Sequence, residues 1–138
     1  MTETWLPIAN YNNYEISSIG RVRNNKTGKI LSQTTQMSGY KQVCLCENGK
    51  RKMHTIHRLV MQAFNPVSKM DSMDVNHIDY DKTNNTLDNL EWVPRRQNLI
   101  NALSNPDLKE LETSLVNAMR SALHQWYDSY IEKNMKAI

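Results

Sequence analysis

The sequence predicts an α+β fold, with an antiparallel β-module first and a long helix last. Three observations predict it. Short strand-like segments separated by turn residues fill the first part of the chain. A strand–loop–strand unit from Val75 to Val93 then leads into a helix at Pro94. Beyond a break at residues 104–107, apolar residues recur every three or four positions, as in an amphipathic helix. The expected segments of the 138-residue chain are 1–56, 57–103 and 104–138.

The first segment is expected to begin with three short strands. Tyr14–Ser17 alternates in polarity, Gly20–Arg23 follows with Val22 as its apolar member, and Lys29–Ser32 is expected to return as a third strand. The residues between the second and third strands, Asn24 to Gly28, are rich in turn formers. These strands would form the first antiparallel layer of the module.

A hairpin is the clearest strand signal in the chain. Tyr40–Cys46 and Lys52–Ile56 flank Asn48-Gly49, a dipeptide that favours the type I′ turn of a tight hairpin. We expect Val43 and Leu45 to share the apolar face of its first strand, because alternate residues of a strand point the same way.

The middle segment combines a short helix with the strand–loop–strand unit. His57–Phe64 has helical spacing and should end at Asn65-Pro66, because the residue before a proline disfavours the helical conformation. Residues 67–73 are expected to be a connector. Pro94 suits the first position of a helix, which should run to about Leu103.

The last segment should be one helix of about 28 residues, capped near Ser104 or Asn105 with Pro106 just inside it. Its apolar stripe favours either packing against the chain or a surface for self-association, and both interpretations stay open. The stripe consists of Leu108, Leu111, Leu115, Ala118, Met119, Ala122, Trp126 and Tyr130.

Composition and cysteine content limit the class of protein. The chain is 39% hydrophobic and 22% charged, and no apolar run reaches the length of a membrane span. Because the N-terminus also lacks a signal pattern, we expect an intracellular protein without membrane association. Cys44 and Cys46 are expected to be reduced strand residues, since a disulfide between positions two apart would be strained.

Basic residues are concentrated between Arg21 and Arg58. That stretch holds nine Lys and Arg residues and one acid, Glu47, so it carries +8; the whole chain carries +3, which leaves −5 for the remainder. A chain polarised in this way is expected to present its basic part to a polyanion. The basic tip of the hairpin, Lys50 to Lys52, also has a size suited to the major groove of DNA.

One histidine, His77, is accompanied by side-chain oxygens along the sequence. Asn76 precedes it, and asparagines recur as far as Asn98 at the start of the next helix. Amide and carboxylate oxygens hold hard cations such as Mg2+, and an imidazole can take a proton from an attacking water. The pattern therefore predicts metal-assisted phosphodiester hydrolysis.

Two stretches of the sequence resemble parts of known endonucleases. Residues 75–98 (VNHIDYDKTNNTLDNLEWVPRRQN) resemble the ββα-metal core of HNH endonucleases, also called the His-Me finger. Residues 5–64 resemble the NUMOD-type strand module that often precedes HNH domains in phage and intron-homing endonucleases. The strings that carry this second resemblance are W-x-P-I, YEIS-x-x-GRVR, GY-x-x-V-x-L and HRLV-x-x-AF.

The resemblance implies roles for four residues of the core. His77 falls on the catalytic general base, and Asn89 on the asparagine that fixes the loop and orients the imidazole. Asn76 and Asn98 fall on the two metal ligands, so the site would hold one divalent ion, Mg2+ or Mn2+, with help from DNA phosphates. The family often has aspartate in place of Asn76, so this site would carry less negative charge.

The remaining polar residues of the loop are given lesser roles. Asn84 and Asn85 are expected to shape turns, and Asp79 and Asp81 to be loop acids outside the metal site. Outside the loop, His57 is expected to be a structural hydrogen-bonding residue.

The resemblance implies a metal-dependent DNA endonuclease that nicks one strand of double-stranded DNA per site. If phage-encoded, it would act in the cytoplasm of a bacterial host. One alternative is an inactive HNH-derived DNA-binding protein. Another is an interaction or scaffold protein that uses its C-terminal helix to form a homodimer or to act with a larger enzyme. The residues expected to contact DNA are Arg21, Arg23, Lys41, Lys50, Arg51, Lys52, Arg95 and Arg96.

Overall fold

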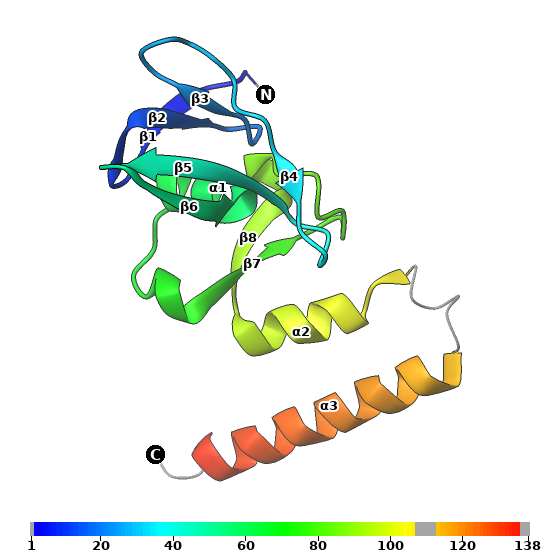
Figure 1. Ribbon diagram of the computed structural model, residues 1–138. Coiled ribbons are helices and arrows are strands. Elements are labelled where there is room, and N and C mark those ends of the chain that lie inside the picture. Colours follow the sequence, from blue (N-terminus) through cyan, green and yellow to red (C-terminus); the bar gives the residue numbers. More distant parts are fainter. Residues whose placement is uncertain (1, 107–112, 136–138) are drawn as a thin grey trace. The chain divides into compact units, whose positions relative to one another are not determined.

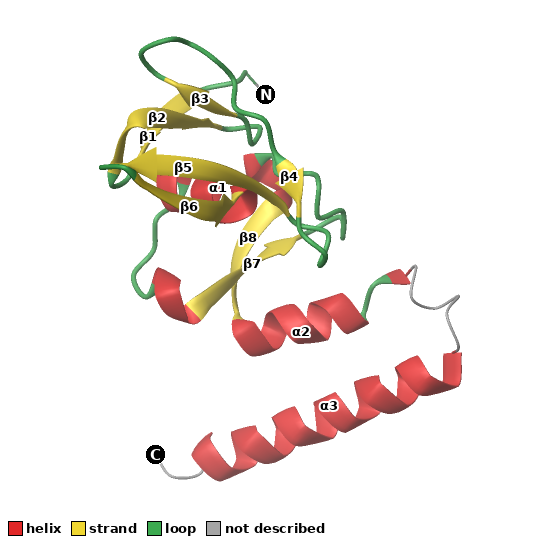
Figure 2. Ribbon diagram, in the orientation of Figure 1, coloured by secondary structure: helices red, strands yellow, loops and turns green. Residues whose placement is uncertain are grey.

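The chain folds into two compact units. The computed structural model describes residues 2–106 and 113–135. The first unit, Met1–Val93, is built largely of strands, and the described part of the second, Pro94–Ile138, is largely helical (Figures 1 and 2). The α+β class is confirmed, with antiparallel strands first, an HNH-like core next and a helix last.

The first sheet is antiparallel and has the order β1-β2-β3. Its strands are β1 (Trp5–Ile8), β2 (Tyr11–Ser17) and β3 (Val22–Asn24). The predicted strand at Lys29–Ser32 is wrong, because this segment contributes only an isolated bridge between Ile30 and Arg23. Gly20 is also not a strand residue: its φ of +85° places it in the turn between β2 and β3.

The second sheet contains the predicted hairpin. It consists of β4 (Thr34–Thr35), β5 (Lys41–Glu47) and β6 (Lys50–Thr55), in that order. Glu47 pairs with Lys50, and the two residues between them both have positive φ, 52° for Asn48 and 75° for Gly49. This is the type I′ geometry expected of an Asn-Gly turn.

A short helix and a third sheet complete the first unit. Helix α1 (Ile56–Phe64) begins one residue earlier than predicted, so Ile56 belongs to the helix and not to the hairpin. A 3₁₀ turn, η1 (Met70–Ser72), lies in the predicted connector. The strand–loop–strand unit consists of β7 (Met73–His77), η2 (Leu87–Asn89) and β8 (Leu90–Pro94), and its two strands pair.

All three sheets and α1 share one hydrophobic core. Ile16 and Val22 come from the first sheet and Leu45 from the second; Ile56 comes from α1 and Val75 from β7, and all five are buried. Full burial of such a side chain stabilises the fold by roughly 1.5–3 kcal/mol. The strand module and the loop that carries His77 are therefore parts of one packed body.

The described residues of the second unit, 94–106 and 113–135, form two helices. Helix α2 (Arg95–Leu103) follows β8 directly and ends where the sequence predicts. Pro94 is its N-cap and the last residue of β8, so its predicted place as the first helical residue is wrong by one position. In helix α3 (Thr113–Met135), Arg120 donates to the carbonyl oxygen of Leu103 at 2.7 Å. The predicted start of this helix at residues 107–112, with Leu108 and Leu111 of the stripe, lies outside the described residues.

Two simpler expectations concern cysteines and membranes. Cys44 and Cys46 are both free thiols on β5, as predicted. Within residues 2–106 and 113–135, none of the helices combines the length and the apolar character that crossing a bilayer requires.

Candidate active site around His77

His77 is the last residue of β7 and is buried, with 5% of its surface exposed. Pairing of β7 with β8 fixes the backbone on one side, and Val75 anchors the strand in the core. Arg58 of α1 also donates to the carbonyl oxygens of Met70 and Met73, at 3.0 and 2.9 Å. The strand that presents the imidazole is therefore held at its start and along its edge.

The imidazole of His77 is oriented by Asn85. Its Nε2 lies 2.8 Å from Oδ1 of Asn85, which is itself 5% exposed. An amide oxygen only accepts hydrogen bonds, so Nε2 carries the proton and Nδ1 keeps a lone pair. The amide nitrogen of Asn85 faces the carbonyl oxygen of Thr83 at 3.5 Å, which agrees with this orientation. The ring is thus held in the tautomer that can accept a proton at Nδ1.

The role of Asn85 corrects the expectation that it only shapes a turn. Its burial depends on a close approach by Gly20: a Cβ added to Gly20 would lie 2.8 Å from Cβ of Asn85 and 3.0 Å from its carbonyl oxygen. One step further along the loop, the backbone N–H of Leu87 donates to the carbonyl oxygen of Ser18 at 2.8 Å. The turn between β2 and β3 therefore holds the loop against His77.

Asn89 fixes the same loop through bonds of its own. Its side chain donates to Asp79 Oδ1 and to the carbonyl oxygen of Asn84, and accepts from the N–H of Asp79. The predicted loop-fixing function therefore matches its contacts, while the direct contact with the imidazole belongs to Asn85. Asp79 and Asp81 act within the loop: Asp79 accepts from Asp81 N–H at 2.8 Å, and Asp81 from Thr83 N–H at 2.9 Å.

Aromatic rings form one side of the site. The ring of His57 lies edge-on to that of His77, with 5.2 Å between centroids, and the ring of Tyr40 is tilted against that of His57, with 4.8 Å between centroids. Burial lowers the pKa of His77, although the bond to Asn85 and the nearby carboxylates of Asp79 and Asp81 oppose that shift. The neutral imidazole is favoured as a result.

His57 is a packing residue with an unusual titration. Burial, and secondarily the proximity of His77 and Arg58, lower its pKa to about 3. Its Nδ1 is buried and has no hydrogen-bond partner within the described part of the chain, so the expected role as a hydrogen-bonding residue is wrong for this atom. Because His57 stays neutral, it adds no positive charge next to His77.

The two predicted metal ligands belong to different elements. Asn76 lies on β7 next to His77, and its Nδ2 donates to Oε1 of Glu91 on β8 at 2.7 Å. Asn98 is the fourth residue of α2, in the second unit. Among the described residues, no three His, Cys, Asp or Glu side chains are grouped to hold a metal ion. The predicted ligands are amides, which are outside that set of residue types.

Comparison with known families gives two matches that follow one another along the chain. The NUMOD4 motif matches residues 3–46, and the HNH endonuclease model matches residues 54–100. The chain belongs to the HNH endonuclease family. The NUMOD4 stretch contains the turn that contacts Asn85, and the HNH stretch contains His77, Asn85 and Asn89.

Relatives from viruses support the assignment. The chain is 36% identical over 127 residues to an HNH endonuclease of Acanthamoeba polyphaga mimivirus, covering 91% of this chain and 35% of the relative. It is 35% identical over 101 residues to the DNA endonuclease I-HmuI of Bacillus phage SP01, covering 72% and 58%.

A solved structure gives the same result. The structure that describes DNA binding and cleavage by the HNH homing endonuclease I-HmuI matches with a TM-score of 0.66 and 34% identity. The match covers 73% of this chain and 58% of that one. The chain thus spans about a third to three-fifths of the length of these relatives.

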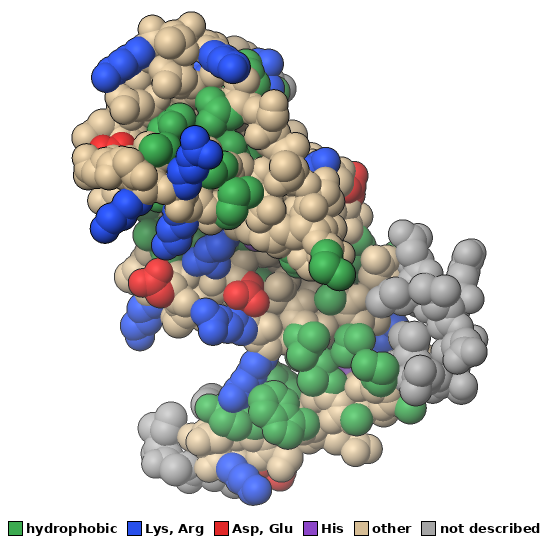
Figure 3. Space-filling view, in the orientation of Figure 1, with side chains coloured by type: hydrophobic (Ala, Val, Ile, Leu, Met, Phe, Trp, Pro, Cys, Tyr) green, Lys and Arg blue, Asp and Glu red, His purple; other side chains and the backbone are tan. Residues whose placement is uncertain are grey.

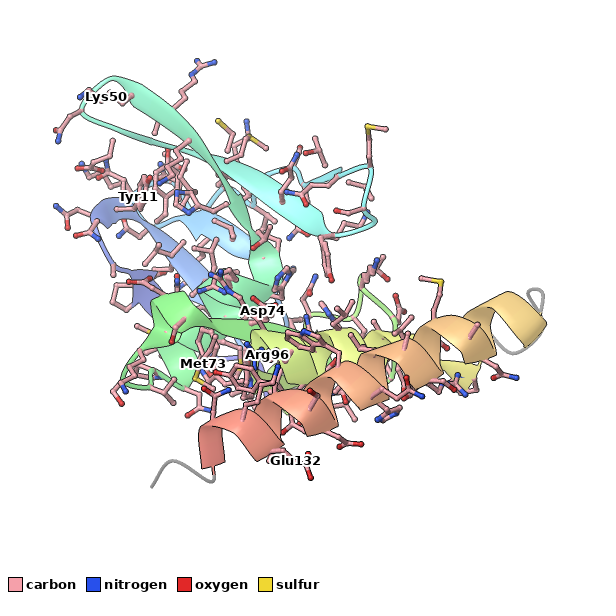
Figure 4. All side chains as sticks on the ribbon, turned by 90° about the horizontal axis from the view of Figure 1, so that it is seen from below. Tyr11, Lys50, Met73, Asp74, Arg96 and Glu132 are labelled. Carbon is pink, nitrogen blue, oxygen red and sulfur yellow. The ribbon has the colours of Figure 1, made fainter. Side chains whose placement is uncertain are left out.

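The tip of the β5–β6 hairpin, which lies between the two matched stretches, carries three of the predicted DNA-binding residues. Lys50, Arg51 and Lys52 are all exposed on β6. With Tyr11 and His54 they line a groove between the β1–β2 turn and the hairpin, whose other lining residues are Asn10 and Glu47. Figure 4 shows Tyr11 and Lys50 at the same end of the first unit, and Figure 3 shows Lys and Arg side chains over the face that the N-terminal strands form.

Arg21, Arg23 and Lys41 differ, because each already has a partner in the fold. Arg21 forms an ion pair with Glu3, and Arg23 pairs with Glu15 at 2.7 Å. The guanidinium of Arg23 also lies 4.1 Å from the ring centroid of Trp5. Nζ of Lys41 donates to Oγ1 of Thr35 at 2.8 Å.

The two predicted basic residues of α2 also have distinct surroundings. Arg95 is exposed in the first turn of the helix. Arg96 packs against α3, with its guanidinium 3.6 Å from the ring centroid of Tyr130 and 4.6 Å from that of Trp126. Such stacking leaves the edge of a guanidinium able to donate hydrogen bonds.

Proposed function

We propose that the chain is a metal-dependent endonuclease that hydrolyses a phosphodiester bond of double-stranded DNA, cutting one strand per site. The observation that carries this proposal is the hydrogen bond from His77 Nε2 to Asn85 Oδ1. It fixes an imidazole whose lowered pKa keeps it neutral, and it leaves Nδ1 to take the proton from water.

HNH nucleases generally depend on a divalent metal, and the chemistry of the predicted ligands here suits a hard ion such as Mg2+ or Mn2+. Oδ1 of Asn76 would be one ligand, next to the general base. Asn98 enters the proposal from the family motif alone. When bound, one divalent ion would stabilise the negative charge that develops on the phosphate and on the leaving 3′ oxygen.

The chain's own residues would divide the remaining work. His77 would deprotonate the water at Nδ1, and Asn85 would hold the ring in place as its charge rises. Asn89 would keep the loop closed through its bonds to Asp79 and Asn84. One such site acts on one strand, so a single chain is expected to nick.

The basic residues that we propose to bind DNA come from both units and differ in their surroundings. The exposed tip formed by Lys50, Arg51 and Lys52 would contact DNA directly, as would Arg95. Arg21, Arg23, Lys41 and Arg96 would contribute through atoms that their partners in the fold leave accessible. The relative I-HmuI is described as binding DNA, which supports the same class of partner here.

Self-association through α3 remains a proposal. Trp126 is 50% exposed and Met119 53% exposed, so part of the apolar stripe is accessible in the second unit. Sedimentation equilibrium over a range of concentrations would show a dimer if the stripe is a self-association surface.

A plasmid assay tests the proposed function. With Mg2+ or Mn2+, the chain should convert supercoiled plasmid to the open-circular form, and excess chelator should prevent this. Open-circular product without linear product indicates single-strand cleavage. Intact plasmid across a range of metals and DNA sources would favour a DNA-binding protein without nuclease activity.

A further inference from the structure

Asn76 stands where many members of the family have aspartate, and it faces a carboxylate on the neighbouring strand. Glu91 is the second residue of β8, and its Oε1 accepts a hydrogen bond from Asn76 Nδ2 at 2.7 Å. A carboxylate accepting from an amide N–H forms a stronger bond than a neutral acceptor would. The pair therefore places a full negative charge beside an amide that has none.

The bond also determines which atom of Asn76 is presented to a cation. Because Nδ2 of Asn76 donates to Glu91, Oδ1 is the atom of this side chain that can ligate a metal ion. An amide that donates to a carboxylate is polarised, which increases the negative character of its oxygen. Mutation of a residue that hydrogen-bonds to a metal ligand commonly lowers metal affinity by about 10- to 100-fold.

We infer that Glu91 is a positioning residue of the metal site, which orients Asn76 and supplies the negative charge that aspartate provides elsewhere in the family. The inference rests on the proposed function, since it requires Asn76 to be a metal ligand. The Asn76–Glu91 pair would then act as a two-residue substitute for a single aspartate.

Metal binding by the whole chain tests the inference without relying on cleavage. Electron paramagnetic resonance measures free Mn2+, so a titration of the protein with Mn2+ alone gives its affinity. Glu91→Gln removes the charge while retaining an oxygen that can accept from Asn76, and should weaken Mn2+ binding about tenfold. Asp128→Asn, which removes an exposed carboxylate from α3, should leave the affinity unchanged.

A charge swap makes the test specific. Asn76→Asp combined with Glu91→Gln moves the carboxylate from position 91 to position 76 and should restore an affinity close to that of the wild type. Glu91 is exposed, so these variants should fold, and their melting temperatures check this.

The outcomes separate the inference from the function on which it rests. If Glu91→Gln binds Mn2+ as well as the wild type while Asn76→Ala binds it less well, Glu91 has no role and Asn76 remains a ligand. If Asn76→Ala also binds like the wild type, the proposed ligand itself is wrong. A wild-type chain that binds no Mn2+ up to millimolar concentrations overturns the inference, and plasmid nicking then decides the function separately.

Discussion

Nε2 of His77 donates to Oδ1 of Asn85 at 2.8 Å, and both side chains are buried. The bond joins the end of β7 to a loop residue eight positions away. It sets the tautomer of the histidine, and its geometry depends on packing of the loop against the turn between β2 and β3. The tautomer of His77, the packing of the loop and the charge beside the imidazole can therefore each be changed by a separate substitution.

Replacement of Asn85 should alter the pH dependence of nicking. Asn85→Ala removes the acceptor from Nε2 and should lower the rate by about 10- to 100-fold. Asn85→Asp places a carboxylate next to the imidazole and should raise the pKa of His77. Because a general base works only when neutral, the acid limb of the rate profile should move to higher pH. NMR titration of the imidazole would measure the pKa directly, and an unmoved pKa in Asn85→Asp would contradict the contact.

Gly20 and Gly49 form a matched pair for testing the packing of the loop. Both have positive φ, +85° and +75°, so alanine at either should cost about 1–2 kcal/mol in backbone strain. A Cβ at Gly49 meets nothing within 4 Å, whereas one at Gly20 would collide with Asn85. Gly20→Ala should therefore lower the free energy of unfolding more than Gly49→Ala, and should alone change the NMR signals of His77. If urea denaturation shows the same loss of unfolding free energy for both variants, the loop moves aside for the added Cβ without loss of stability.

His57 should make the fold sensitive to acid. Its pKa is about 3 in the folded chain and about 6.5 in the unfolded chain, so only the unfolded state binds its proton between these values. The contribution to stability is complete above pH 6.5 and is lost as the pH falls towards 3, by about 2 kcal/mol between pH 8 and pH 5. His57→Phe keeps a ring and cannot titrate, so denaturation at the two pH values should show a smaller difference. A difference equal to that of the wild type would mean that other groups cause the acid sensitivity.

The hairpin tip should contribute to the salt dependence of DNA binding. Reversing the charge at Lys50, Arg51 and Lys52 should weaken binding to a DNA duplex and flatten the plot of log affinity against log salt concentration, by about 0.9 for each phosphate that the protein no longer neutralises. Lys69→Glu is the control, since Lys69 is exposed and lies outside the basic stretch. Unchanged affinity and slope in the triple variant would place the DNA-binding surface elsewhere.

Local signals in the sequence predicted the elements whose structure is decided locally. The Asn48-Gly49 turn determines its own hairpin, and the helix predicted at Pro94 begins at the next residue, Arg95, with Pro94 as its N-cap. Strand β1 was not predicted: Pro7 lies inside it, and proline is accepted only at the edge of a sheet. The edge position depends on pairing with β2, which is not visible in the segment itself.

The parts of the site that were missed depend on contacts between distant residues. Asn85 looks like a turn residue until Gly20, far away in the sequence, packs against it. Likewise, the charge count from Arg21 to Arg58 leaves out Glu3 and Glu15, which pair with Arg21 and Arg23. Local counts of charge therefore overestimate how many of these cations are available to DNA.

The most direct test of the central claim compares the wild type with His77→Ala in the plasmid assay with Mg2+ or Mn2+. Loss of the general base should lower the rate of nicking by about 10²- to 10⁴-fold, while affinity for a DNA duplex stays close to that of the wild type. Nicking by His77→Ala at the wild-type rate would contradict the assignment of His77 as the base.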